Sequence, residues 1–74
     1  MHQNLSVQDQ IELIKKGINN KGILEKVENA DIYCEEDRYL YIKILKTNDI
    51  DCAYIIYANM DTAAREEFIG LIKE

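Results

Sequence analysis

Arg38-Tyr39-Leu40-Tyr41-Ile42-Lys43-Ile44-Leu45-Lys46 is the stretch that decides the predicted fold. Every second residue from Leu40 to Ile44 is aliphatic, and the residues between them are Tyr41 and Lys43. A period of two is typical of a β-strand that buries one face, because successive side chains point to opposite faces. We therefore predict a strand over residues 38–46, with its tyrosines on the face opposite the core.

The same period extends to both sides of this strand. Residues 30–35 alternate in the same way, and Glu35-Glu36-Asp37 is interpreted as a charged turn between the two strands. Thr47-Asn48-Asp49 is typical of a tight hairpin connection. Residues 51–58 then form a third strand that is apolar at nearly every position. Its inward set stays open, because both Cys52-Tyr54-Ile56-Ala58 and Ala53-Ile55-Tyr57 fit.

A helix is predicted at each end of the chain. Ser6 is a good N-cap for the first helix, and an Asn or Gly22 in the segment 19–22 ends it in the left-handed conformation. Its apolar stripe is Val7, Ile11, Ile14 and Ile18. Asp61 or Thr62 caps the second helix. Its core stripe is Ala64, Phe68, Leu71 and Ile72, with Ile69 beside it.

These elements predict an α+β fold in the order α-β-β-β-α, with a three-stranded antiparallel meander and two helices packed on one face. The 74 residues form a single domain, 1–74, in which we expect residues 1–4 to be disordered. No apolar run approaches the roughly 18 residues of a membrane span, and from the first residues we expect no signal peptide. The expected compartment is the cytoplasm, and no contact with a membrane is expected.

Residues that most catalytic sites require are missing from this chain. It has one histidine, His2, one serine and three glycines. Hydrolytic, redox and phosphoryl-transfer chemistry need an activated nucleophile, a metal cluster or a phosphate-binding glycine loop. We therefore expect no enzyme activity, no metal site and no cofactor. Cys34 and Cys52 are predicted to be buried thiols on non-adjacent strands, too far apart for a disulfide.

Acidic residues dominate the charge, with 14 acids against 9 bases and a net charge of −5. Eight of the acids lie between positions 25 and 51, where a sheet edge and its turns would carry them as a negative stripe. The residues assigned to partner binding are Asp31, Glu35, Glu36, Asp37, Asp49 and Asp51. Such a stripe can imitate a phosphate backbone and occupy the basic groove of a nucleic-acid-binding protein. The alternative is charge that serves only solubility.

Tyrosines are the second signal, because the period of two would gather them on an open sheet face. The residues predicted to form this face are Tyr33, Tyr39, Tyr41, Leu45 and Tyr57. Tyrosine is enriched at protein interfaces, so we predict a homodimer joined through this face. Base stacking is the rival interpretation, but the chain lacks the basic residues and the glycine-aromatic motif of RNA-binding sheets. Direct binding of nucleic acid is therefore not expected.

The general plan resembles the small acidic proteins with which bacteriophages disable host or defence machinery, several of which are DNA mimics. The resemblance rests on the acids of residues 25–51 and on the tyrosines named above, and it covers the plan of the chain without a shared motif. It implies a non-catalytic inhibitor that binds a basic, nucleic-acid-binding protein in the host cytoplasm. A generic interaction or assembly module is the alternative, and a small enzyme or ligand-binding domain is a third class.

Overall fold

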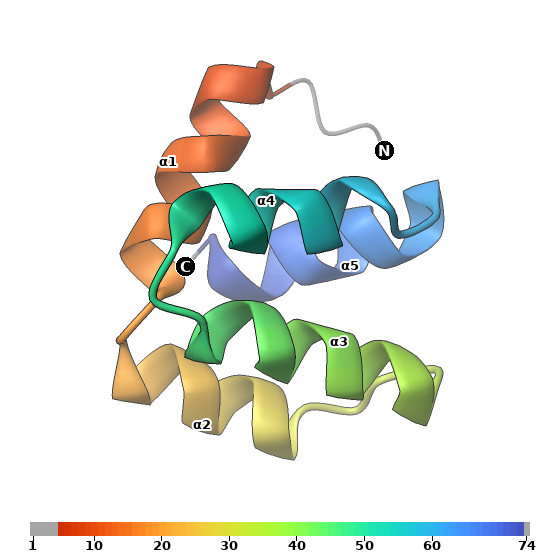
Figure 1. Cartoon of the computed structure of the whole chain (residues 1–74). Coiled ribbons are helices and arrows are strands. Elements are labelled where there is room, and N and C mark those ends of the chain that lie inside the picture. Colours follow the sequence, from red (N-terminus) through yellow and green to blue (C-terminus); the bar gives the residue numbers. More distant parts are fainter. Residues whose placement is uncertain (1–4, 74) are drawn as a thin grey trace.

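The computed structural model describes residues 5–73, and the chain in this range is all-helical. It contains five α-helices: α1 (Val7–Gly17), α2 (Lys21–Asn29), α3 (Glu35–Lys46), α4 (Ile50–Ala58) and α5 (Thr62–Ile72) (Figure 1). Helices hold 75% of these residues, and none of residues 5–73 lies in a β-strand. The predicted α+β fold with its α-β-β-β-α order is therefore wrong. The disorder predicted for residues 1–4 falls outside the described residues.

Helix α3 replaces the central strand of the predicted sheet. Its buried residues are Tyr41, Ile44 and Leu45, which are spaced as one side of a helix. The three acids interpreted as a turn form its first turn, and its last turn carries Lys43 and Lys46. This order of charges stabilises a helix, because acids favour the positive amino-terminal end of the helix dipole and bases the carboxyl-terminal end.

Helix α4 replaces the third strand. Ala53 and Tyr57, four residues apart, are its buried side chains, while Ile55 is 60% exposed. Asp49 does not close a hairpin but caps this helix, accepting a hydrogen bond from the backbone N–H of Asp51 at 2.9 Å. A short run that is apolar on all sides shows no clear period, so it fits a buried helix as well as a strand.

Both terminal helices and the caps at Ser6 and Asp61 are confirmed, but in the first predicted stripe Val7 is 57% exposed and Ile18 follows the end of α1. The Ser6 hydroxyl accepts a hydrogen bond from the backbone N–H of Asp9 at 3.0 Å, and the Asp61 carboxylate accepts one from Ala64 at 2.9 Å. Asn19 follows α1 with a φ of 65°, which is the left-handed conformation that was predicted for an Asn or Gly22. Of the predicted core stripe of α5, Ala64, Phe68 and Ile72 are buried, as is Ile69 beside it, whereas Leu71 is only partly buried.

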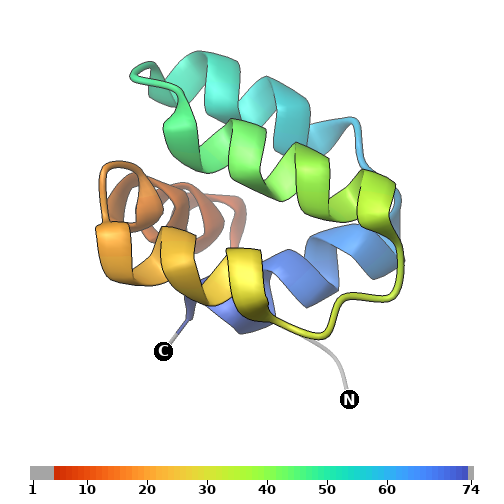
Figure 2. The same cartoon turned by 90° about the horizontal axis from the view of Figure 1, so that it is seen from below.

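The helices enclose one continuous core. Helix α3 packs between α2 and α4, and α1 and α5 close the remaining sides, as the two views show (Figures 1 and 2). The carboxyl end of α1 approaches α3 closely, because a Cβ atom on Gly17 would lie 3.0 Å from Cδ2 of Leu45. Only glycine permits this approach without a shift of the leucine side chain.

Tyr41 occupies the centre of this core. Its side chain is fully buried, and its ring centroid lies 5.1 Å from that of Phe68 on α5. Its hydroxyl donates a hydrogen bond to Oε1 of Glu67 at 2.6 Å and lies 3.1 Å from the carbonyl oxygen of Ala64. Burial, followed by the hydrogen bond to Glu67, raises the pKa of Tyr41 far above its ordinary value. Tyr41 is thus a neutral donor that fixes α3 against α5.

The tyrosine-bearing face predicted from the sequence does not exist as one surface. Tyr41, Leu45 and Tyr57 lie in the core. The Tyr57 hydroxyl donates to Oε1 of Gln10 at 2.8 Å, which joins α4 to α1. Only Tyr33 and Tyr39 of the predicted set stay exposed. The predicted face was wrong because it assumed a strand period of two. Residues two apart share a face of a strand, whereas residues three or four apart share a face of a helix.

Replacing Tyr41 with Phe tests the buried hydrogen bond. The Tyr41→Phe variant leaves the Glu67 carboxylate without its donor, so we expect it to lower the free energy of unfolding by about 1–2 kcal/mol. The matched Tyr39→Phe change removes an exposed hydroxyl and should have an effect within about 0.5 kcal/mol. Urea unfolding followed by circular dichroism measures both. Equal losses in the two variants would contradict the central position of Tyr41.

Candidate functional site

Acids from three separate segments gather at one end of the molecule. The α2–α3 loop, the first turn of α3 and the start of α5 meet there, at the right of Figure 1. Asp37 has Asp61, Glu67 and Glu36 as electrostatic neighbours, and Arg38 has Glu35, Asp31 and Glu67. We call this set the acidic end: Asp31, Glu35, Glu36, Asp37, Asp61 and Glu67.

The remaining two acids predicted to bind a partner, Asp49 and Asp51, are not part of the acidic end. They lie at the start of α4, at the left of Figure 1, beside the carboxyl end of α3. Hydrogen bonds from Asp51 N–H, from the Cys52 thiol and from Cys52 N–H lower the pKa of the Asp49 carboxyl. Asp49 therefore stabilises the start of α4, and the predicted negative stripe is divided between two ends of the molecule.

Asp61 and Glu67 are the members of the acidic end that the sequence did not indicate. They follow Asp37 by more than twenty positions and were interpreted only as residues of the last helix. They approach Asp37 because Tyr41 packs on Phe68 and bonds Glu67, which sets α5 beside α3. No local sequence signal could have joined them, since this proximity depends on the packing of two helices.

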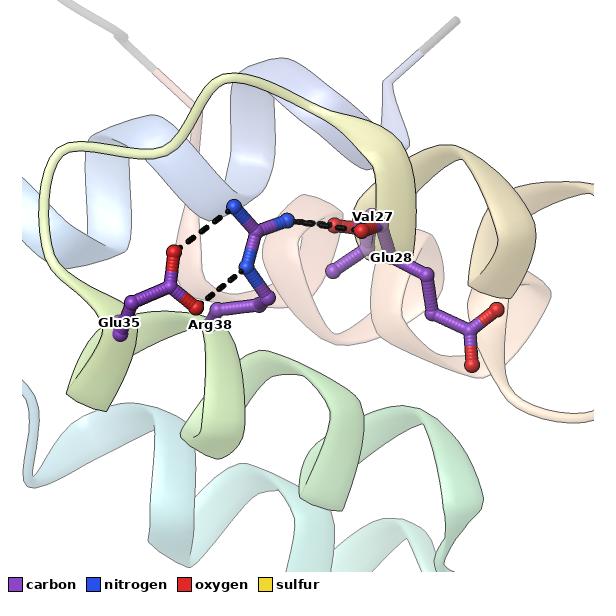
Figure 3. A network of polar contacts seen from close by, with 4 residues as sticks. All are labelled: Val27, Glu28, Glu35 and Arg38. Atoms are coloured by element: carbon purple, nitrogen blue, oxygen red, sulfur yellow. Dashed lines mark hydrogen bonds and ion pairs between the residues drawn. The ribbon is translucent and has the colours of Figure 1, made fainter.

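Arg38 holds the α2–α3 loop in place (Figure 3). Its Nη1 donates to the carbonyl oxygens of Val27 and Glu28, each at 2.9 Å, at the carboxyl end of α2. Its Nε and Nη2 donate to the two carboxylate oxygens of Glu35, at 2.9 and 3.1 Å. The hydrogen bond from Arg38 lowers the pKa of Glu35. A planar guanidinium suits this arrangement, because it can bind a carboxylate with two donors and still reach the helix end.

Arg65 does the same for the turn between α4 and α5. Its Nη1 donates to the carbonyl oxygen of Met60 and lies 3.5 Å from that of Ala58, and its Nη2 donates to Oγ1 of Thr62 at 3.2 Å. Arg38 and Arg65 are the two arginines of the chain. Each binds carbonyl groups at the end of the preceding helix, where the helix leaves them without backbone partners. Both loops of the acidic end are therefore held by several hydrogen bonds.

Negative potential concentrates around Asp37. Partial burial, followed by repulsion from Asp61, Glu67 and Glu36, raises the pKa of its carboxyl. This direction is opposite to that of Glu35 and Asp49, whose pKa values are lowered by hydrogen bonds. The acidic end therefore holds charges that repel one another, which a positively charged surface would relieve.

An exposed tyrosine lies within this end. Tyr33, in the α2–α3 loop between Asp31 and Glu35, is 99% exposed. A tyrosine ring offers a large apolar surface and a hydroxyl, a combination that is common in protein interfaces. Acids and an aromatic side chain thus share one surface, which can provide both charge and apolar contact to a partner.

The cysteines differ from their prediction. Both are free thiols, but Cys52 is exposed and Cys34 is only partly buried. Neither lies on a strand: Cys34 directly precedes α3, and Cys52 lies in the first turn of α4. The hydrogen bond between Cys52 and Asp49, together with the charge of Asp49, raises the pKa of the Cys52 thiol. This thiol is therefore a weaker nucleophile at neutral pH than an ordinary cysteine.

Metal sites and hollows are the other features that could support chemistry. Among residues 5–73 no group of three or more His, Cys, Asp and Glu side chains is arranged to hold a metal ion. A hollow of about 190 Å³ is bordered by Gln10, Tyr57 and Arg65, whose polar groups bond to other protein groups. None of the helices described is both long and apolar enough to cross a membrane.

Comparison with protein-family models, with curated proteins and with solved structures gave no match to this chain.

Two substitutions at the acidic end should change stability in opposite directions. The pKa of Asp37 is raised in the folded protein, so stability falls as the pH rises from the ordinary pKa of aspartate to this raised pKa. The charged form of Asp37 therefore destabilises the fold at pH 7. Asp37→Asn should therefore raise the melting temperature at pH 7. The lowered pKa of Glu35 gives stability that is present above the ordinary pKa of glutamate and lost on acidification. Glu35→Gln should therefore lower the melting temperature at pH 7.

Thermal unfolding of both variants at pH 7 and at about pH 3, below the ordinary pKa values of both acids, measures these effects. The difference for Asp37→Asn should shrink at the lower pH, where the Asp37 carboxyl is protonated, and the difference for Glu35→Gln should shrink as the pH falls toward the lowered pKa of Glu35. Shifts of the same sign at pH 7 would contradict the difference in environment between Asp37 and Glu35.

Proposed function

We propose that this domain is a non-catalytic protein-binding module whose acidic end docks on a basic surface of another protein. The observation that supports it is the meeting of acids from the α2–α3 loop, α3 and α5 around Asp37, beside the fully exposed Tyr33. Partial burial and then repulsion from Asp61, Glu67 and Glu36 raise the pKa of Asp37, and a cationic partner would offset the repulsive part of that cost. Because a single exposed ion pair contributes only about 0–1 kcal/mol, affinity must come from several acids together with Tyr33.

The partner class that fits best is a nucleic-acid-binding protein. Such proteins carry clustered Lys and Arg side chains on the surface that contacts phosphates. A module that occupies this surface excludes the nucleic acid, so its effect is inhibition by competition. The contact area is smaller than the stripe expected from the sequence, since Asp49 and Asp51 lie at the other end of the molecule. Action in the cytoplasm, that of a host cell included, is part of this proposal, and two free thiols suit a reducing compartment.

One observation favours a second function, that of a generic interaction module. A shallow groove of about 380 Å³ between α1 and α4 is bordered by Ile11, Ile50, Tyr54 and Ile55, and Ile55 is 60% exposed. A partner bound there would be recognised by apolar contact. Its affinity would vary little with salt, whereas docking through the acidic end weakens as salt screens the charges.

Charge reversal at the acidic end tests the main proposal. The double variant Asp31→Lys/Asp37→Lys keeps Glu35, Glu67 and the Asp61 cap intact. The matched control Glu25→Lys/Asp51→Lys makes the same change in net charge on exposed residues outside the acidic end. The probe is the set of heparin-binding proteins from a bacterial lysate, captured on the immobilised domain and then eluted with duplex DNA.

We expect the wild type and the control to capture proteins that duplex DNA displaces. The acidic-end variant should bind them at least about tenfold more weakly. Capture should also decline as salt rises from about 50 to about 200 mM. Retention by the acidic-end variant, equal loss in the control or capture that DNA does not displace would overturn the proposal. Circular dichroism of each variant confirms that the helices are retained.

A further inference from the structure

The outer side of α3 presents a straight ridge of four exposed side chains. Glu36, Tyr39, Lys43 and Lys46 follow one another at steps of three, four and three residues, so they line one side of the helix. Tyr41, Ile44 and Leu45 occupy the opposite side, in the core. Tyr39 is 66% exposed. We call these four residues the α3 ridge.

Charge is ordered along this ridge. The acid stands at its amino end, the tyrosine follows, and the two lysines stand at its carboxyl end. When a second ridge is laid against the first in the opposite direction, Glu36 faces Lys46 of the second copy and Tyr39 faces its Lys43. The ridge is therefore complementary to itself about a two-fold axis. We propose that the α3 ridge is a docking surface for a second copy of this chain, bound as an antiparallel α3–α3 pair.

A two-fold axis doubles each of these contacts, because both copies use the same surface. The pair would contain two Glu36–Lys46 ion pairs and two contacts of a lysine with a tyrosine ring, an arrangement in which the cation is attracted to the ring face. A parallel pair would instead place Glu36 against Glu36 and Lys46 against Lys46. Charge complementarity therefore selects both the occupant and its direction.

Shape supports the same occupant. Tyr39, Ile42, Lys43, Lys46 and Thr47 border a shallow groove of about 440 Å³ along the ridge. The groove can receive an aromatic ring from the second copy, because Ile42 and Tyr39 give it an apolar wall. In Figure 2, α3 lies between α2 and α4 with no other segment in front of it. The ion pairs Lys15–Glu12 and Arg38–Glu35 do not involve any of the four ridge residues.

The predicted pair is weak and sensitive to salt. Two ridges of one short helix bury less than the roughly 1,200 Å² of stable interfaces, so we expect a dissociation constant in the upper micromolar range. Glu36 belongs both to the acidic end and to the ridge, but the Asp31→Lys/Asp37→Lys variant leaves all four ridge residues in place, so it separates this proposal from the proposed function. It also differs from the dimer predicted from the sequence, of whose residues only Tyr39 belongs to the ridge.

A pair of charge reversals gives a specific test. Glu36→Lys places lysine opposite lysine, and Lys46→Glu places glutamate opposite glutamate. Each variant alone should therefore self-associate at least about tenfold more weakly than the wild type. In a mixed pair of the two variants, both contacts between positions 36 and 46 join opposite charges. The mixture should therefore form a mixed dimer at least as tight as that of the wild type. Sedimentation velocity at low salt and at up to about 1 mM protein measures all three samples.

Lys16→Glu is the matched control for Lys46→Glu, because it makes the same charge change on α1. This control variant should self-associate like the wild type. A wild type that stays monomeric at the highest concentration, or a mixture no tighter than its components, would overturn the proposal. If a charge variant fails to fold, dilution of the wild type followed by NMR decides the question. The signals of Tyr39, Ile42 and Lys43 should move, whereas movement confined to Val7 and Ile55, or none, would refute an α3–α3 pair.

Discussion

The rest of the structure depends on one buried hydrogen bond, from the hydroxyl of Tyr41 to the carboxylate of Glu67. A hydroxyl without a partner in the core would cost more than the bond contributes, so burial of Tyr41 requires α5 to present an acceptor at that position. The register of α5 on α3 is set in this way, and the ring of Phe68 then packs on Tyr41. The same register brings Asp61 and Glu67 to the first turn of α3, which creates the acidic end.

Short helices need defined ends, and most helix ends of this domain are held by side chains. Ser6, Asn20, Asp49 and Asp61 each accept a hydrogen bond from the backbone at the start of a helix. Arg38 and Arg65 bind carbonyl groups at the ends of α2 and α4. Such contacts matter in a chain of this size, because isolated helices of nine to twelve residues are marginal in water. The result is a small domain in which side-chain hydrogen bonds tie several loops to the ends of neighbouring helices.

How far the sequence could predict this fold depends on the segment. The helices at both ends were predicted with their caps, because Ser6 and Asp61 precede clear helical stripes. The central segment was not, because Leu40, Ile42 and Ile44 repeat every second residue, while Leu40 and Ile44 also stand four apart as on a helix. The acidic first turn and basic last turn of α3, and the cap at Asp49, were helix signals of the kind that succeeded elsewhere.

The candidate site was predicted in part for the same reason. Asp31 and the acids of residues 35–37 are close in the chain, so their proximity survives the change from strand to helix. Asp61 and Glu67 could not be added, because only the packing of α5 on α3 brings them near. The wrong period also moved Tyr41, Leu45 and Tyr57 from the core to a surface, because a change of period changes which residues face inward.

The placement of acids at one end has a consequence for how the molecule moves in solution. Lys15 and Lys16 end α1, and Lys43 and Lys46 end α3, so these lysines lie toward the end opposite Glu36 and Asp37. The molecule therefore carries a permanent electric dipole, which the peptide groups of α3 oppose in part, because the positive end of their dipole lies beside the acids. In the field of a positively charged surface, such a body rotates so that its acidic end leads before any contact forms. This orientation accelerates productive encounters without strengthening the final complex, and dissolved salt removes the advantage over distances of about 10 Å.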